Sequence, residues 1–216
     1  MGFFFGKKER LDKFLIQKQA DGKTHASIAP AITHELGGKK EKAVIFLSKM
    51  HGFENTIKTR ELSEGITLLN DYYKMIIDTT LKFEGEFLGI FAGFVFNVFG
   101  AQIRHHNDIR RAARCSLEIQ KEIKGFNDER TMRGLEIMKI GMALNVGEII
   151  IGHFGSSRRM NYSAMGEPID LCCKFCEMAE PGQVLATQSI CDDIKDLGDV
   201  ILLRPYRVSN TAKPIP

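Results

Sequence analysis

Two apolar runs with a short break between them constrain the fold of this chain most. EFLGIFA (86–92) and FVFNVFG (94–100) are rich in aromatic and β-branched residues, and the break falls at Ala92-Gly93. Each run is too short for an amphipathic helix, and residues of these types favour extended strands. A tight break that contains glycine is typical of an antiparallel turn. The segment therefore predicts a β-hairpin, so the fold has to contain an antiparallel sheet.

Apolar patterns along the rest of the chain predict further strands and helices. AVIFLS (43–48) is nearly continuous and apolar, as in a strand that is buried on both faces. Apolar residues at three- and four-residue spacing predict a long amphipathic helix over about 56–82. The other expected elements are a helix at 107–125, a second hairpin within 138–155 that turns near Asn145-Val146-Gly147, a helix at 167–179, a strand at 183–187, a short helix at 188–195 and a strand at 199–208. This order predicts an α+β fold, a ferredoxin-like mixed or antiparallel sheet with helices packed on one face.

The length of 216 residues suits one domain with a full core. We expect an N-terminal appendage at 1–40 with a short helix near 9–19, a domain at 41–208 and a tail at 209–216. The start of the chain, MGFFFGKK, has two interpretations: residues 1–8 contact an anionic membrane surface, or they pack locally. The local interpretation is favoured.

The charge of the chain does not favour nucleic acid as a partner. Its 30 basic and 27 acidic residues leave a net charge of +3, and the basic residues are scattered rather than gathered in one stripe. No apolar run approaches the ~20 residues that cross a bilayer.

The cysteines favour a reducing cytoplasm, because there are five of them, an odd number. Cys172, Cys173 and Cys176 form a cluster that could suggest zinc. The cluster lacks the second ligand pair of a zinc site, and helical spacing places Cys172 and Cys176 on one face. We therefore prefer packing of a helix against a sheet over metal binding.

Four segments resemble a known family. They are AVIFLSKMHGF (43–53), EGEFLGIFAGFVFNVFG (84–100), the stretch 138–175 and PGQVLAT (181–187). In order and spacing they resemble the catalytic domain of class III adenylate and guanylate cyclases, over about 42–208. The resemblance implies head-to-tail dimers with shared active sites. It also implies two divalent metal ions that hold a triphosphate and activate a ribose hydroxyl for in-line attack.

The residues aligned with the metal-binding positions of that family cannot bind metal. Aligned on Gly52 and Phe53, the first metal-binding aspartate falls at Lys49; counted back from Phe99-Gly100, the second falls at Gly93. One positive charge thus replaces two negative ones, and neither side chain offers the oxygen ligands that magnesium prefers. Two unit positive charges ~4 Å apart repel by about 1 kcal/mol in water and about 4 kcal/mol at an effective dielectric of 20. We expect no metal here.

The remaining functional positions of the family are also altered. The two base-recognition positions fall at Gly89 and Asn161. The ribose-positioning asparagine becomes Asp170, which would repel a triphosphate, and the transition-state arginine becomes Lys174. Lysine keeps the charge but lacks the planar fork that binds phosphate oxygens in pairs. The resemblance therefore implies the fold without the catalytic residues.

A phosphate-bearing ligand bound without metal is one hypothesis for the altered site. Lys49 precedes Gly52-Phe53, which we expect to open the long helix, where free backbone N–H groups attract anions. Lys174 would add a second positive charge. The alternative, a solvated lysine at a strand end, is favoured. Surface or packing roles are expected for the remaining candidates, His105, His106 and His153.

We therefore expect a catalytically inactive cyclase-homology domain without a cofactor, cytoplasmic and prokaryotic. It would act as a regulatory module by forming a homodimer, or a heterodimer with another cyclase-like domain. A first alternative is a divergent cyclase that converts ATP or GTP to the cyclic nucleotide. The nearby carboxylates are Glu54, Asp71, Glu84 and Glu86, and none replaces a metal-binding aspartate. A second alternative is an unrelated ferredoxin-like binding domain.

Overall fold

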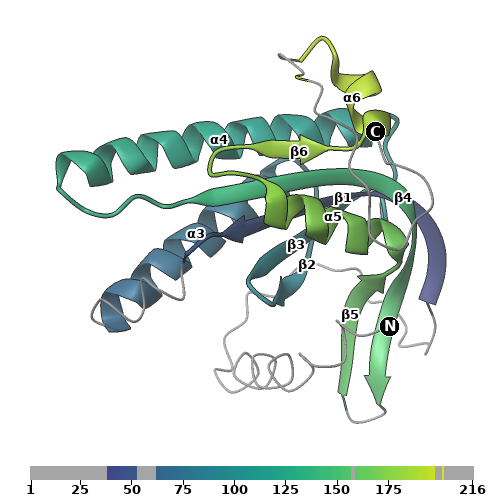
Figure 1. Cartoon of the computed structure of the whole chain (residues 1–216). Coiled ribbons are helices and arrows are strands. Elements are labelled where there is room, and N and C mark those ends of the chain that lie inside the picture. The colour runs from purple at the N-terminus through teal and green to yellow at the C-terminus, as the bar shows by residue number, and fades with distance from the viewer. Residues whose placement is uncertain (1–37, 53–61, 157–158, 198–200, 202–216) are drawn as a thin grey trace.

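The computed structural model describes residues 38–52, 62–156, 159–197 and 201. Its strands are β1 (Gly38–Met50), β2 (Glu86–Phe91), β3 (Phe94–Phe99), β4 (Ile140–Ser156), β5 (Arg159–Met165) and β6 (Val184–Ala186). They form one sheet in the order β2-β3-β1-β4-β5, with β6 paired to β4 (Figure 1). All pairings are antiparallel except that of β4 with β6, so the sheet is mixed.

The hairpin predicted from residues 86–100 is confirmed. β2 and β3 pair antiparallel, and the turn between them is Ala92-Gly93. Both turn residues have a positive φ, +50° at Ala92 and +82° at Gly93. A two-residue turn with both φ angles positive matches the twist of the strands it joins.

β1 is the central strand, because it pairs with β3 on one side and with β4 on the other. Residues 43–47 are at most 2% exposed. Val44 and Phe46 belong to one hydrophobic cluster, and Ala43, Ile45 and Leu47 belong to another. The strand predicted at 43–48 is therefore confirmed, and it is buried on both faces. It begins at Gly38, three residues before the domain start that we predicted at residue 41.

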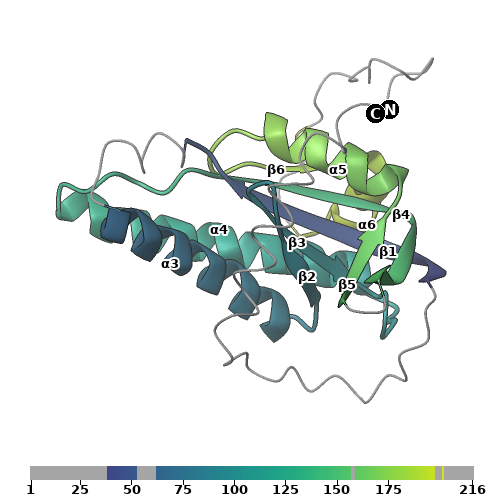
Figure 2. The ribbon, with the colours of Figure 1, turned by 90° about the horizontal axis from the view of Figure 1, so that it is seen from below.

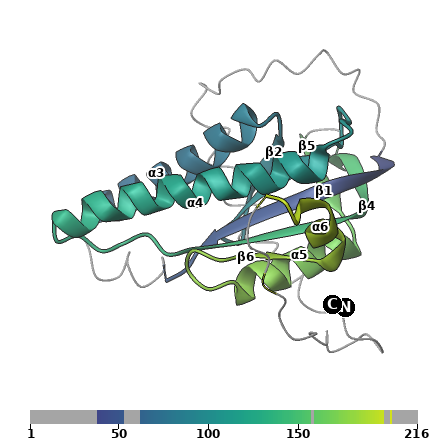
Figure 3. The same ribbon diagram turned by 90° about the horizontal axis from the view of Figure 1, so that it is seen from above.

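Helices cover both faces of the sheet. The helices are α3 (Leu62–Lys82), α4 (Asp108–Met132), α5 (Glu167–Met178) and α6 (Gln188–Ile194). α3, α4 and α6 pack on the face of Val44 and Phe46, and α5 packs on the opposite face (Figures 2 and 3). The α+β class and the mixed sheet are confirmed. The expectation of helices on one face is wrong, since both apolar faces of β1 need a cover.

The second hairpin does not turn where the sequence suggested. β4 runs unbroken through Asn145 and Gly147, and it pairs with β1 from Ile140 to Gly152. The side-chain amide of Asn145 donates a hydrogen bond to the carbonyl of Pro168 at 2.8 Å. A Cβ at Gly147 would lie 2.5 Å from Cγ of Pro168. Asn145 and Gly147 therefore do not form a turn; they contact Pro168 at the start of α5. The strand that pairs with β4 in the hairpin is β5, which follows Ser156.

The other predicted elements agree with the structure within a few residues, except that α4 extends to Met132, beyond the expected end at 125. The expected helix near 9–19, the start of the long helix at 56–61 and most of the strand at 199–208 lie outside the described residues. No helix in the described part of the chain is long and apolar enough to span a membrane.

The cysteines of α5 pack against the sheet, as preferred from the sequence. Cys172 and Cys176 are fully buried. Sγ of Cys172 lies 3.5 Å from the carbonyl oxygen of Ala143, and Sγ of Cys176 lies 3.5 Å from that of Gly141. Burial raises the pKa of both thiols well above the usual value. The two residues therefore act as small apolar contacts under the helix.

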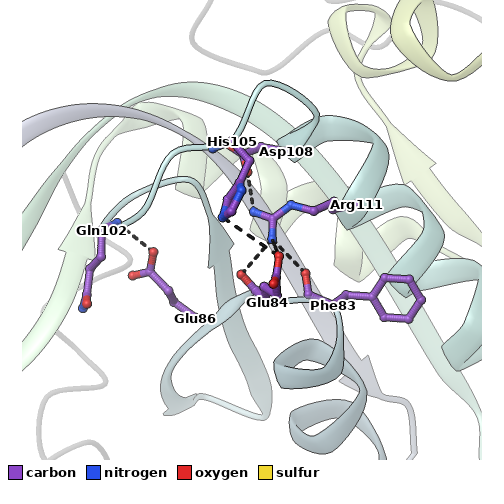
Figure 4. Close-up of polar contacts among 7 residues, drawn as sticks. All are labelled: Phe83, Glu84, Glu86, Gln102, His105, Asp108 and Arg111. Carbon is purple, nitrogen blue, oxygen red and sulfur yellow. Dashed lines mark hydrogen bonds and ion pairs between the residues drawn. The ribbon is translucent and has the colours of Figure 1, made fainter. Parts of the chain in front are cut away.

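A buried arginine joins the start of α4 to the connection between α3 and β2 (Figure 4). Arg111 is 8% exposed and donates hydrogen bonds to the carbonyl oxygens of Phe83 and Glu84 at 3.1 and 3.2 Å. It also bonds to the carboxylates of Glu84, at 2.9 Å, and Asp108. The backbone N–H of His105 donates to Asp108 as well. This network fixes the loop that precedes α4.

Gly100 is required beside this network, because its φ is +79° and an added Cβ would lie 2.2 Å from Oδ2 of Asp108. We expect Gly100→Ala to lower the free energy of unfolding by about 2 kcal/mol or more. A left-handed backbone costs alanine about 1–2 kcal/mol, and the carboxylate has to move as well. Gly125→Ala in α4 is the matched control, since its Cβ meets nothing within 4 Å. It should stabilise by about 0.5–1 kcal/mol in urea unfolding. A Gly100→Ala protein as stable as this control would contradict the argument.

Candidate functional site

The structure brings together the two residues that the sequence aligned with the metal positions. Lys49 is the penultimate residue of β1 and pairs with Phe94, the first residue of β3. Gly93 directly precedes Phe94 in the hairpin turn. Cε of Lys49 lies 4.0 Å from the position that a Cβ at Gly93 would occupy. The candidate site therefore lies at the end of β1, against the turn between β2 and β3.

The ammonium group of Lys49 already has two partners. Its Nζ lies 3.4 Å from Oε1 of Glu177 in α5 and 4.7 Å from the centre of the Phe94 ring. The Lys49 side chain is 27% exposed and that of Glu177 is 51% exposed. A cation over an aromatic face and beside a carboxylate is electrostatically satisfied. Lys49 is thus an ion-paired residue rather than the solvated lysine that we favoured from the sequence.

The residues at this site do not fit a pair of divalent ions. Lys49 supplies a cation, Gly93 supplies no side chain, and Glu177 is the carboxylate that contacts Lys49. Within the described residues, no group of three or more His, Cys, Asp or Glu side chains could hold a metal ion. Magnesium in proteins prefers several oxygen ligands, carboxylates among them. The chemistry of these side chains therefore disagrees with two-metal catalysis.

The two positions aligned with base recognition lie on different edge strands. Gly89 is in β2, opposite Phe96, and an added Cβ there would meet nothing within 4 Å. Asn161 is in β5, opposite Phe154. β2 and β5 stand at the two ends of the strand order. The assignment of these positions to base recognition stays a prediction.

The positions aligned with ribose and phosphate binding share one helix. Asp170 lies in the first turn of α5, and Lys174 follows one turn later. Burial raises the pKa of Asp170, and the nearby Lys174 acts in the opposite direction while Glu167 raises it further. The same helix carries Glu177, the partner of Lys49. α5 therefore connects the altered phosphate positions to the altered metal positions, although their family roles stay a prediction.

The metal-free anion site is only partly described. Gly52 is exposed with a φ of +74°, whereas Phe53 lies outside the described residues. An anion that approached Lys49 would have to share its ammonium group with the carboxylate of Glu177 and would be repelled by that carboxylate. The geometry thus makes Glu177 a competitor for any phosphate at this lysine.

Sequence reasoning missed Glu177, because it lies 128 residues from Lys49 along the chain. Only the docking of α5 on the sheet brings the two together. The histidines are placed as expected from the sequence. His105 and His106 precede α4, and Nε2 of His105 lies 4.0 Å from a carboxylate oxygen of Glu84. His153 is in β4, and its ring lies 5.2 Å from that of Tyr162.

Comparison with known proteins identifies the family. The family described as Adenylate and Guanylate cyclase catalytic domain matches residues 37–200. The chain belongs to this family. The alternative of an unrelated ferredoxin-like domain is therefore wrong. Adenylate cyclase 1 of Rhizobium meliloti (strain 1021) is 19% identical over 160 residues, which cover 73% of this chain and 24% of that protein. The chain spans only 24–30% of the length of the first curated relatives it matches.

Solved structures of cyclase domains share the fold. The guanylyl cyclase Cya2 superposes with a TM-score of 0.77 at 24% identity, covering 83% of this chain and 91% of that one. The adenylyl cyclase CyaB from P. aeruginosa gives a TM-score of 0.75 at 24% identity, covering 83% and 93%. The resemblance to class III cyclases seen in the sequence is thus confirmed for family and fold. The loss of catalytic positions stays a prediction.

We expect the combined variant Lys49→Asp and Gly93→Asp to bind Mn²⁺, and the natural chain not to bind it. The variant places two carboxylates side by side and frees Glu177 from its ion pair, so it supplies the oxygen ligands that a hard cation needs. Asp tolerates the positive φ of +82° at position 93 better than most residues do. Electron paramagnetic resonance of free Mn²⁺ measures the binding.

The matched control is Lys49→Asn with Gly93→Asn, which has the same shape without the two charges. It should bind Mn²⁺ at least about tenfold more weakly than the aspartate variant, since charged ligands dominate affinity for hard cations. Binding of Mn²⁺ by the natural chain at this site would contradict the argument on ligand chemistry.

Proposed function

We propose that this chain is a catalytically inactive cyclase-homology domain that acts as a dimerising regulatory module. One observation carries the proposal: the ion pair between Lys49 and Glu177, 3.4 Å long, lies beside the side-chain-free Gly93. Phosphoryl transfer by two metal ions needs carboxylates at this place. An internal cation that is already paired cannot replace ions that bridge a triphosphate and its attacking hydroxyl.

The composition of α5 supports the same proposal from the other half of the site. Asp170 is an acid where a triphosphate would approach, and Lys174 lacks the planar fork of arginine. Sites in the family are shared between protomers, so each composite site of a homodimer would take both altered halves from this chain. A heterodimer with an intact cyclase would contain one altered half in each site. In a homodimer, dimerisation itself would be the regulatory signal. In a heterodimer, this chain would inhibit the intact cyclase.

The proposed setting is signalling in a prokaryotic cytoplasm. Its support is the bacterial origin of the similar Rhizobium meliloti protein and the five cysteines, all described, none of which forms a disulfide. Free and buried thiols are typical of a reducing compartment.

The second candidate, a divergent adenylate or guanylate cyclase, needs carboxylates from elsewhere. Glu84 is bound by Arg111, and one oxygen of Glu86 accepts the backbone N–H of Gln102 at 2.7 Å (Figure 4). Burial raises the pKa of Glu86, which favours its neutral form and weakens it as a metal ligand. Both carboxylates, Glu84 and Glu86, therefore already make hydrogen bonds within the fold.

The decisive experiment combines an activity assay with sedimentation. We expect no cyclic nucleotide from the purified chain with Mn-ATP or Mn-GTP, together with a dimer in analytical ultracentrifugation at micromolar concentration. An active class III cyclase domain in the same buffer is the control for the assay. Product that disappears when Asp170 and Lys174 are replaced by alanine would establish the divergent cyclase instead. A monomer at all concentrations would remove the dimerising module.

Nucleotide binding without metal is a finer part of the proposal and has its own test. Since Glu177 competes for Lys49, we expect ATP in EDTA to bind Glu177→Gln about tenfold more tightly than the natural chain, which equals about 1.4 kcal/mol. Lys49→Gln should abolish the binding. Isothermal titration measures all three proteins. Flat traces for all of them would remove metal-free binding at Lys49 and leave the proposal of inactivity standing.

A further inference from the structure

An open cavity lies far from Lys49, toward the other end of β1. Its volume is about 440 Å³. Its floor is formed by Val44 of β1 with the residues that pair with it on each side, Phe99 of β3 and Val146 of β4. Lys42 and Lys49 are seven residues apart on one strand, which corresponds to about 20 Å. The cavity is therefore separate from the candidate site of the cyclase family.

The walls of the cavity come from the loop before α4, from the start of α4 and from Asp193 of α6. α6 lies beside the N-terminal end of α4 (Figure 3). The residues that line the cavity therefore come from segments distant in the sequence. Ligand sites for small molecules typically have volumes of about 300–1,000 Å³ and combine apolar surface with a few polar groups. This cavity has the size for a small molecule rather than for a macromolecule.

Basic side chains predominate in the lining. Five are basic and two are acidic: Lys42, Arg104, His105, His106 and Arg110 against Asp108 and Asp193. Of the two acids, Asp108 is bonded to groups of the fold, whereas Asp193 leaves a negative charge on the wall beside Arg110. The carboxylate of Asp108 is bonded to Arg111 and to the backbone N–H of His105. Asp193 lies beside Arg110. The guanidinium group of Arg110 donates a hydrogen bond to the backbone carbonyl of Asp193 at 2.9 Å.

When contacts to the described residues are considered, three of the five basic groups retain donors for a ligand. Arg110 is held by the carboxylate of Asp196 at 2.6 and 2.7 Å, and His105 faces Glu84 (Figure 4). Among the described residues, Arg104 is bonded through Nη2 alone, to the carbonyl of Lys42 at 2.9 Å and to Glu41 at 3.4 Å.

Within the part of the chain that the structure describes, Lys42 and His106 also keep donors. Glu148, which interacts electrostatically with Lys42, is already paired to Lys40 at 2.8 Å. The His106 side chain is exposed at the mouth of the cavity. Lys42, Arg104 and His106 therefore line one cavity, above an apolar floor, with donors left over after their contacts to the described residues.

We propose that this cavity binds a small organic anion, with a phosphate or carboxylate group held by Lys42, Arg104 and His106. The apolar body of the ligand contacts Val146 and Ile109, which line the cavity and remain partly exposed. The backbone N–H groups in the first turn of α4 add positive potential, because Asn107 makes no side-chain capping bond to them. The inference does not rest on the proposed function, since it concerns another end of the sheet.

Isothermal titration with phenyl phosphate in EDTA tests the proposal, with benzoate, inorganic phosphate and phenol as comparisons. We expect phenyl phosphate or benzoate to bind, inorganic phosphate to bind more weakly and phenol not to bind. The first two arms distinguish a phosphate from a carboxylate ligand. Binding of phenol as strong as that of both anions, or no binding of either anion, would overturn the proposal.

Variants locate the binding. Arg104→Gln should weaken it by about tenfold or more, because a charge-assisted hydrogen bond is lost. Arg104 is 59% exposed, so the fold should tolerate the change, and His106→Gln offers an independent second variant. Lys121→Gln removes the same charge from an exposed part of α4 and should bind as the natural chain does. Unchanged binding in both cavity variants, or loss of binding in Lys49→Gln, would place the ligand elsewhere and overturn the inference.

Discussion

The burial of β1 on both faces is the constraint on which the rest of this structure depends. Residues 43–47 are at most 2% exposed, and they alternate between two separate hydrophobic clusters. A shift of one residue would exchange the two sets of side chains, so the register of the strand is strongly specified. The register in turn fixes what stands at the end of the strand. Lys49 has to meet Phe94, and α5 has to lie over the face that places Glu177 beside it.

That arrangement makes the fold independent of the residue at the end of β1. The pairing of β1, β3 and β4 uses backbone groups and buried apolar side chains, none of which depends on a carboxylate at the strand end. The ion pair of Lys49 is partly exposed, and pairs of this kind contribute about 0–1 kcal/mol. The free energy of unfolding therefore depends little on which residue occupies position 49. The fold therefore tolerates a lysine at the end of β1.

The two ends of β1 differ in what surrounds them. At the Lys49 end the cation is paired with a carboxylate and covered by an aromatic ring. Toward the other end, basic groups line an open cavity together with two acids, Asp193 and Asp108, of which Asp108 is bound by the buried Arg111. The anion site that we propose therefore lies at the start of α4, away from Lys49 and Gly93. The same rigid strand connects both places.

The sequence by itself determined the features that depend on neighbours along the chain: the hairpin at Ala92-Gly93, the buried strand at 43–48, the amphipathic helices and the family resemblance. The resemblance also singled out Lys49 and Gly93, and the structure places them side by side. Only the tertiary structure decided that α5 covers the second face, that Asn145 and Gly147 serve the docking of Pro168 instead of a turn, and that Glu177 pairs with Lys49. The physical reason is that periodicity and turn chemistry are local. These three contacts join segments 21 to 128 residues apart and form only when two packed layers meet.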